Sequence, residues 1–200
     1  MKYILFVLVF AALNAKASVI GITTHPLNEE ARVLSAEMTG YMSQRQEMGM
    51  GLRYTQEVNP GQRLDIAAGS AQYSRGLFLG GGMDFELLHE EGNQPRISVK
   101  PYYQYQKFEG NKQNVMGAAP TIRKGFSIEG YEFFPYLAFP TGIKIDSATD
   151  TYDYYASATL GASMPFPGAE GEKFLLSFEG NKNLGAASDY LGVLFSWVWK

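Results

Sequence analysis

The chain contains no cysteine, only two histidines, and little charge of either sign. The absence of cysteine excludes disulfides, cysteine-based zinc sites, thiol catalysis and a lipid-modified N-terminal cysteine. The 17 lysine and arginine residues nearly balance 20 aspartate and glutamate residues, so we expect no basic stripe and no nucleic-acid partner. Charged residues make up 18% and apolar residues 46% of the chain, a composition that argues against disorder. A length of 200 residues is typical of one domain.

Long hydrophobic runs are also missing, except near the N-terminus. Residues 1–17 combine Lys2, an apolar run of 11 residues and the small residues Ala15 and Ala17. These features are typical of a secretory signal peptide that is cleaved after Ala17. A run of 11 residues is too short for a helix across about 30 Å of hydrocarbon. We therefore expect 1–17 to be a signal peptide and the exported chain to contain no transmembrane helix.

Repeated alternation of apolar residues with polar or small residues dominates the rest of the chain. After an N-terminal arm at 18–32, the alternation predicts strands of roughly ten residues separated by turns such as Asn59-Pro60-Gly61. The predicted strands are 33–43, 47–57, 64–73, 77–88, 97–107, 115–123, 131–145, 152–164, 173–179 and 190–199. The segment 124–130 is ambiguous between loop and strand, and merging the uncertain segments would leave eight strands.

The length of these segments favours a membrane barrel. A strand that spans a bilayer needs about 9–11 residues, whereas strands of soluble sandwiches have nearer 5–6. In hydrocarbon every backbone polar group must be bonded within the sheet, so the sheet must close. The expected fold is all-β: a closed, antiparallel, up-and-down transmembrane β-barrel of 8–10 strands that occupies 33–200. An even strand number places both termini on one side, which is usually the periplasmic side.

The two faces of the predicted strands differ in polarity. The apolar face would contact lipid, and the opposite face collects charged residues of both signs. Charges enclosed in a narrow barrel need opposite charges beside them. We therefore expect an interior ion-pair network formed by Glu37, Arg53, Asp84, Glu86, Lys100 and Arg123. In it, Arg53 would neutralise carboxylates such as Asp84 and Glu86, and Gly80 and Gly82 would leave room for long side chains.

Aromatic residues gather near the ends of the predicted strands. Amphipathic rings favour the headgroup level of a bilayer, so such a set predicts aromatic belts at the two membrane interfaces. An aromatic residue of any β protein can also be part of a core, which is the alternative for each residue taken alone. The expected belt residues are Tyr103, Tyr105, Tyr131, Phe133, Tyr152, Tyr154, Trp197 and Trp199.

With its signal peptide and repeated amphipathic strands, the sequence resembles the small outer-membrane β-barrel superfamily of the OmpA/OmpX/OmpW type. The segments ISVKPYYQYQ (97–106) and FFPYLAFPTG (133–142) are similar in style to strands of such proteins. The last strand, YLGVLFSWVWK, resembles the C-terminal signal read by the barrel assembly machinery, although Lys200 follows the final aromatic Trp199. The resemblance implies location in the outer membrane of a Gram-negative-type envelope, with membrane lipids and the assembly machinery as partners.

Three functions remain open. A charged, side-chain-filled interior predicts a structural or interaction role without turnover. A narrow pore for passive transport of small solutes, porin-like in its polar lumen, is the alternative, because ten strands leave slightly more room than eight. A lipid-modifying enzyme is the second alternative. A soluble lipocalin-like barrel, with its apolar faces turned inward, is a competing fold.

The enzymatic alternative depends on few residues. His89 lies beside Glu90 and Glu91, and a carboxylate can orient a histidine base. No serine is fixed near His89 by the sequence, and His25 lies in the arm. We expect both histidines to be non-catalytic and expect no cofactor or metal. The oligomeric state is left open.

Overall fold

The computed structural model describes residues 25–27, 30–41, 48–71, 76–108, 111–166, 174–185 and 189–200. The signal peptide expected at 1–17 and most of the arm expected at 18–32 lie outside these residues. None of the described residues belongs to a helix long and apolar enough to cross a membrane. The described part of the chain is built from antiparallel β-strands.

Twelve strands are assigned along this part of the chain. Their bounds are β1 (Arg32–Tyr41), β2 (Met48–Asn59), β3 (Gln62–Ala71), β4 (Gly76–Leu88), β5 (Arg96–Phe108), β6 (Asn111–Arg123), β7 (Phe126–Ile128), β8 (Tyr131–Ala138), β9 (Thr141–Asp146), β10 (Thr151–Pro165), β11 (Phe174–Asn183) and β12 (Tyr190–Trp199).

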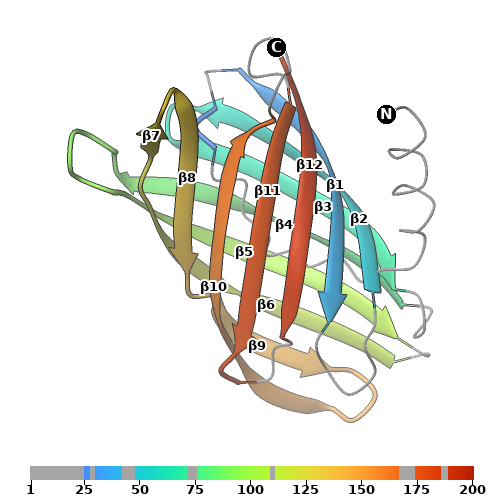
Figure 1. Ribbon diagram of the computed structural model, residues 1–200. Coiled ribbons are helices and arrows are strands. Elements are labelled where there is room, and N and C mark those ends of the chain that lie inside the picture. Colours follow the sequence, from blue (N-terminus) through green and yellow to red (C-terminus); the bar gives the residue numbers. More distant parts are fainter. Residues whose placement is uncertain are drawn as a thin grey trace, which may run out of the picture.

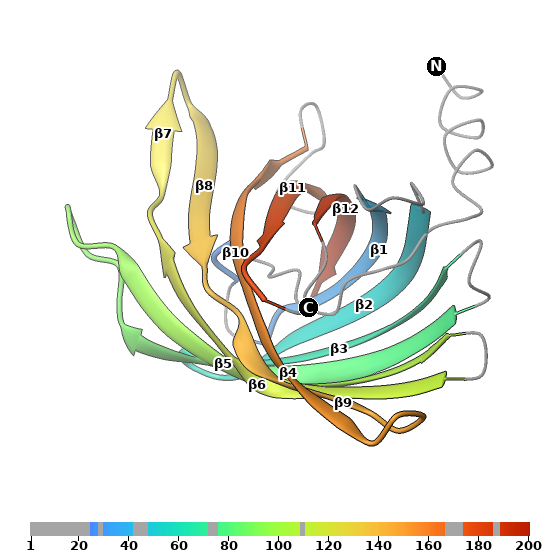
Figure 2. The same cartoon turned by 90° about the horizontal axis from the view of Figure 1, so that it is seen from below.

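The strands close into an antiparallel up-and-down barrel (Figures 1 and 2). Strands β1 to β6 pair in chain order, β12 pairs with β1, and β10 pairs with β11. Both β8 and β9 lie between β6 and β10, so together they form one wall strand, while β7 follows β6 and pairs only with β8. The twelve assigned strands therefore make a wall of ten, which settles the choice between eight and ten.

The strand expected at 131–145 is interrupted between β8 and β9 by Phe139 and Pro140. Proline has no backbone N–H, so it cannot donate a bond to the sheet. Neighbouring bonds keep the wall together at this point: the Phe139 N–H donates to the Pro120 carbonyl, and the Ser157 N–H donates to the Pro140 carbonyl. The interruption breaks the regular ladder and leaves the barrel closed.

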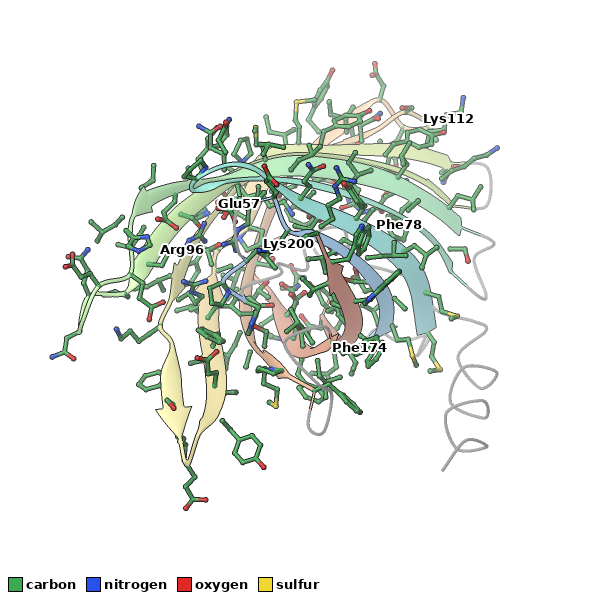
Figure 3. All side chains as sticks on the ribbon, turned by 90° about the horizontal axis from the view of Figure 1, so that it is seen from above. Glu57, Phe78, Arg96, Lys112, Phe174 and Lys200 are labelled. Carbon is green, nitrogen blue, oxygen red and sulfur yellow. The ribbon has the colours of Figure 1, made fainter. Side chains whose placement is uncertain are left out.

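Side chains alternate between an apolar exterior and a polar interior. On β12, Leu191, Phe195 and Trp197 are 40–54% exposed, whereas Ser196 and Leu194 between them are 1–2% exposed. Glu57 and Arg96 point to the enclosed side of the wall (Figure 3). Most of the large exposed apolar side chains lie on the outer face. The arrangement is the opposite of a lipocalin-like barrel, which encloses its apolar faces.

The two ends of the barrel are different. Arg32, the first residue of β1, pairs with Trp199, the last residue of β12, and we call this the terminal end. The turn between β2 and β3, the loop between β4 and β5, and the hairpin of β7 and β8 lie at this end. That hairpin extends beyond the neighbouring strands (Figure 2).

Candidate functional site

A buried cluster of four charged side chains lies in the barrel interior. Arg53 donates from Nη2 to Glu37 Oε2 over 2.7 Å and from Nη1 to Asp65 Oδ2 over 2.6 Å. The Lys100 ammonium donates to the same oxygen of Asp65, and the Thr55 hydroxyl donates to Asp65 Oδ1 over 3.0 Å. We call Glu37, Arg53, Asp65 and Lys100 the central cluster. It has two cations and two anions, all at most 5% exposed.

Small residues on neighbouring strands make this cluster possible. Arg53 pairs with Ser35 on β1 and with Ala67 on β3, so its long side chain meets no bulky neighbour across either strand. Asp65 pairs with Gly82 on β4, where an added Cβ would lie 2.4 Å from the Pro101 carbonyl oxygen and 3.0 Å from the Cε of Lys100. A larger residue at position 82 would therefore clash with the backbone of β5 and compete with Lys100 for the space beside Asp65.

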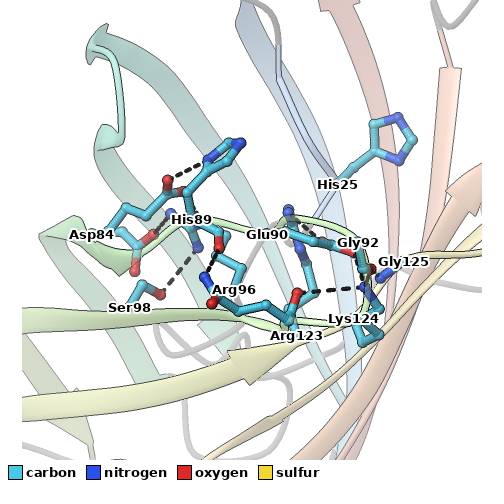
Figure 4. A network of polar contacts seen from close by, with 12 residues as sticks. His25, Asp84, His89, Glu90, Gly92, Arg96, Ser98, Arg123, Lys124 and Gly125 are labelled. Carbon is cyan, nitrogen blue, oxygen red and sulfur yellow. Dashed lines mark hydrogen bonds and ion pairs between the residues drawn. The ribbon is translucent and has the colours of Figure 1, made fainter.

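A second group of charges lines the terminal end of the interior (Figure 4). Arg96 donates to Asp84 over 2.7 Å and to Glu86 over 2.5 Å, and also to the hydroxyl of Ser98. The other two ion pairs join Arg63 to Glu57 over 3.1 Å and Arg123 to Glu90 over 3.0 Å. We call this group the terminal rim; its members are Glu57, Arg63, Asp84, Glu86, Glu90, Arg96 and Arg123.

Glu90 connects the rim to the loop that follows β6. Its Oε1 accepts the Gly125 N–H over 2.7 Å and lies 3.5 Å from the Lys124 ammonium, while Oε2 accepts from Arg123. Partial burial acts to raise the pKa of Glu90, but the Gly125 hydrogen bond and the Arg123 charge outweigh it and lower the pKa below its usual value. Glu90 is therefore held ionised as the counter-charge of Arg123.

A buried carboxylate on the opposite wall is held by two tyrosines. The hydroxyls of Tyr136 on β8 and Tyr190 on β12 both donate to Glu179 on β11. The ring of Tyr136 crosses Gly161 on β10, where an added Cβ would lie 2.4 Å from the tyrosine oxygen. Because Gly161 pairs with both Tyr136 and Glu179, the missing side chain is what lets the ring reach across one strand.

The described part of the N-terminal arm enters the terminal end of the barrel. His25 is only 2% exposed, and its ring packs edge-on against Phe134 with 4.8 Å between ring centroids. The His25 carbonyl accepts a hydrogen bond of 3.2 Å from Arg63 Nη1. Both Phe134 and Arg63 belong to the inward-facing set, so His25 lies inside the wall.

The structure brings the six predicted network residues together only in part. Glu37 contacts Arg53 directly, and Lys100 reaches Arg53 through Asp65. The expected pairing of Arg53 with Asp84 or Glu86 was wrong, because both carboxylates bind Arg96 and the strand register places Arg53 beside Glu37 and Asp65. Arg123 is paired with Glu90, which lies in a loop.

Sequence reasoning missed several members of the two clusters. The missed members are Glu57, Arg63, Asp65, Glu90 and Arg96. Glu179, which accepts from Tyr136 and Tyr190 outside the two clusters, was missed as well. Arg63 and Arg96 lie one residue before the predicted strands 64–73 and 97–107. Extending the alternation by one position would have placed Arg96 on the same face as Ser98 and Lys100.

All eight predicted belt residues lie on outward-facing positions of their strands. Four are near the far end of the barrel, on β5 and β10, and four are near the terminal end, on β8 and β12. Tyr131, Tyr152 and Tyr154 are the most exposed, at 65–70%. The far-end set is Tyr103, Tyr105, Tyr152 and Tyr154, and the terminal-end set is Tyr131, Phe133, Trp197 and Trp199.

His89 and Ser98, which were considered for catalysis, are each bound to a charged residue of the terminal rim. His89 has an 80% exposed side chain and its Nδ1 lies 2.7 Å from Glu86 Oε1, not from Glu90 or Glu91 as the sequence suggested. The Ser98 hydroxyl accepts from Arg96. Among the described residues, no three histidine, aspartate or glutamate side chains converge on a common point where they could hold a metal ion.

Comparisons with known proteins give likenesses of structure only. No family model and no curated protein matches the sequence. A de novo designed transmembrane β-barrel aligns over 86% of this chain and 98% of its own, with 9% identity and a TM-score of 0.41. An outer membrane channel from Pseudomonas putida F1 aligns over 91% and 100%, with 10% identity and a TM-score of 0.47. The functional proposal rests on the residues of this chain.

Proposed function

We propose that the protein is an integral outer-membrane β-barrel whose interior is sealed by ion pairs, and that it has a structural or interaction role. One observation carries this proposal: the wall is apolar outside and ionic inside. Leu52 on the outer face of β2 is 60% exposed, whereas Arg53, the next residue, is 0% exposed. An apolar outer surface of this kind is unfavourable in contact with water and favourable in contact with lipid acyl chains.

The closed interior supports a role other than transport. A water-filled lumen would leave inward-facing side chains accessible to water. In this barrel Glu37, Lys100 and Thr159 are 0–3% exposed although they face inward. The long side chains of the central cluster fill the space that a solute would have to cross, as expected for a narrow barrel.

Location and partners follow from the same proposal. The signal peptide expected at 1–17 would export the chain, and the alternating last strand that ends in Trp199 would be read by the barrel assembly machinery. Membrane lipids would contact the outer face. Membership in the OmpA/OmpX/OmpW-type superfamily is the finer form of this proposal, and it rests on the strand pattern and the C-terminal aromatic.

Two measurements on the purified protein test the proposal. We expect heat-modifiable migration on a denaturing gel, because a folded barrel migrates differently before and after boiling. In planar bilayers we expect no steady conductance steps. As a matched control, Glu37, Arg53, Asp65 and Lys100 are all changed to serine, which keeps the net charge and removes the central cluster. This variant should conduct, and steady steps from the unmodified protein would contradict the sealed interior.

A narrow pore is the second candidate, and one feature of the wall favours it. The inner face of β10, β11, β12 and β1 carries several small polar residues, opposite the long charged side chains of β2 to β5. These small residues are Ser35, Ser157, Thr159, Ser163, Ser177 and Ser196. If the central cluster moved aside, this wall would offer hydroxyl groups to a passing solute.

The lipid-modifying enzyme remains a prediction from the sequence, and His89 is its only support. Changing His89 to alanine and comparing the lipid profile of cells tests it. An unchanged profile would remove this candidate.

A further inference from the structure

We propose that His25 latches the N-terminal arm inside the terminal end of the barrel, and that protonation of its ring releases the arm. The latch is independent of whether the barrel conducts, and it assigns a role to the one buried histidine of the described residues.

Two contacts hold His25, and a third supports the ring against which it packs. The imidazole packs edge-on against Phe134 of β8, and the His25 carbonyl accepts from Arg63 of β3. The guanidinium of Arg123 from β6 lies 5.7 Å from the centre of the same Phe134 ring. Strands β3 and β8, which are far apart in the sequence, thus both contact one residue of the arm. None of these contacts uses the ring nitrogens of His25, which have no hydrogen-bond partner among the described residues.

The backbone has a left-handed residue, Glu30, close to the point where the arm meets β1. Glu30 has a φ of 67°, in the left-handed region that is uncommon for residues other than glycine. The next residue, Ala31, is 2% exposed, and its carbonyl accepts the Glu57 N–H over 3.3 Å. Glu30 lies between the start of β1 and the segment 25–27 inside the wall.

The surroundings of His25 favour the neutral ring. The charged groups that face it are Arg63 and Arg123, whose carboxylate partners Glu57 and Glu90 are already engaged in ion pairs. A second positive charge here would be buried without a counter-ion, which is costly. Burial, with the added positive charges of Arg123 and Arg63, lowers the pKa of His25 from 6.5 to about 4.

The direction of the pH effect follows from this shift. The pKa of His25 is about 4 when the arm is docked and 6.5 when the arm is free, so the free arm binds the proton more tightly. Docking is therefore strongest above pH 6.5 and weakens as the pH falls toward 4, by roughly tenfold per pH unit and roughly 300-fold in total. Release would remove the hydrogen bond between the His25 carbonyl and Arg63 of the terminal rim.

Spin-label distances on the folded, membrane-inserted protein test the latch. Because the chain has no cysteine, Pro26→Cys and Asn93→Cys provide the only two labelling sites, one in the arm and one in the exposed loop between β4 and β5. We expect a narrow distance distribution at pH 7 and a broad one at pH 3. A distribution that stays narrow at pH 3 would overturn the proposal.

Two variants separate His25 from other acid-sensitive groups. His25→Phe keeps an aromatic ring beside Phe134 but cannot be protonated, so its distribution should stay narrow at both pH values. His25→Lys carries a positive charge at both pH values, so its distance distribution should be broad at pH 7 and at pH 3. Release of the His25→Phe arm at pH 3 would assign the effect to the carboxylates and refute the latch. Loss of the heat-modifiable gel band at pH 3 in the unmodified protein would also refute it, because the acid-sensitive element would then be the wall.

Discussion

Arg96 and Arg123 lie directly opposite each other on β5 and β6, two like charges on adjacent strands of the same inner face. Such a pair is destabilising unless each cation has its own anion. Arg96 is bound by Asp84 and Glu86, and Arg123 is bound by Glu90. In the terminal rim, each guanidinium group therefore has at least one carboxylate of its own, which makes the like charges of Arg96 and Arg123 compatible.

Glu90→Gln removes the counter-charge of Arg123 and should lower the free energy of unfolding by roughly 1.5–3 kcal/mol, the range for hydrogen bonds to charged groups. The measurement is a denaturant titration of the barrel in detergent. Glu91→Gln is the matched control, because Glu91 is the next residue and is exposed. Equal unfolding midpoints for the two variants would show that the Arg123–Glu90 pair contributes nothing.

The same pair predicts a pH dependence. The pKa of Glu90 is lower in the folded protein than in the unfolded chain, so its contribution is present above the unfolded pKa of about 4.3 and is lost as the pH falls through the folded value. The difference in stability between the unmodified protein and Glu90→Gln should therefore shrink as the solution is acidified below about pH 4. A difference that grows on acidification would have the wrong sign for this account.

Arg53→Ala leaves Glu37 and Asp65 without the cation between them. Removing one partner of a fully buried ion pair costs about 3–5 kcal/mol. Lys182→Ala breaks an ion pair with Asp189 that is as short, 2.6 Å, but has a 72% exposed lysine, so it should cost at most about 1 kcal/mol. The two variants are compared by unfolding midpoints in the same detergent. Similar midpoints would mean that the central cluster is not needed for stability.

Gly161→Ala places a methyl group where the Tyr136 ring lies. The ring would have to move off Glu179, and overpacking of this kind costs about 1–3 kcal/mol. Gly180→Ala on the adjacent strand is the control, since its nearest neighbour would be the flexible Leu191 side chain at 3.3 Å. Thermal unfolding compares the two. A Gly180→Ala variant that is less stable than Gly161→Ala would contradict the role given to Gly161.

Alternation alone was sufficient to predict the wall. An apolar residue at every second position predicts both the strand and the face that meets lipid, so Leu191, Phe195 and Trp197 could be assigned outward from the sequence. All ten predicted strands correspond to wall strands. Pro140 was the exception, because a missing N–H breaks a ladder bond without changing the alternation.

Ion-pair partners could not be predicted in the same way. Which carboxylate meets Arg53 depends on the register of β1, β2 and β3 relative to one another, and alternation within one strand carries no register information. Arg96 and Glu90 were missed for a related reason. Arg96 is the first residue of β5 and Glu90 lies in the loop before it, where the alternation of apolar and polar residues ends.

Lipid contact with the outer face is the central claim, and a fluorophore on Leu160→Cys tests it most directly. Leu160 is on the outer face of β10 and is 65% exposed, and the absence of native cysteine makes the label unique. Asn93→Cys, in the exposed loop between β4 and β5, is the aqueous control. In vesicles that contain nitroxide-labelled acyl chains, the account predicts strong quenching at position 160 and little at position 93. Quenching of the Leu160→Cys label by iodide in the water phase, with none from the lipid nitroxide, would contradict it.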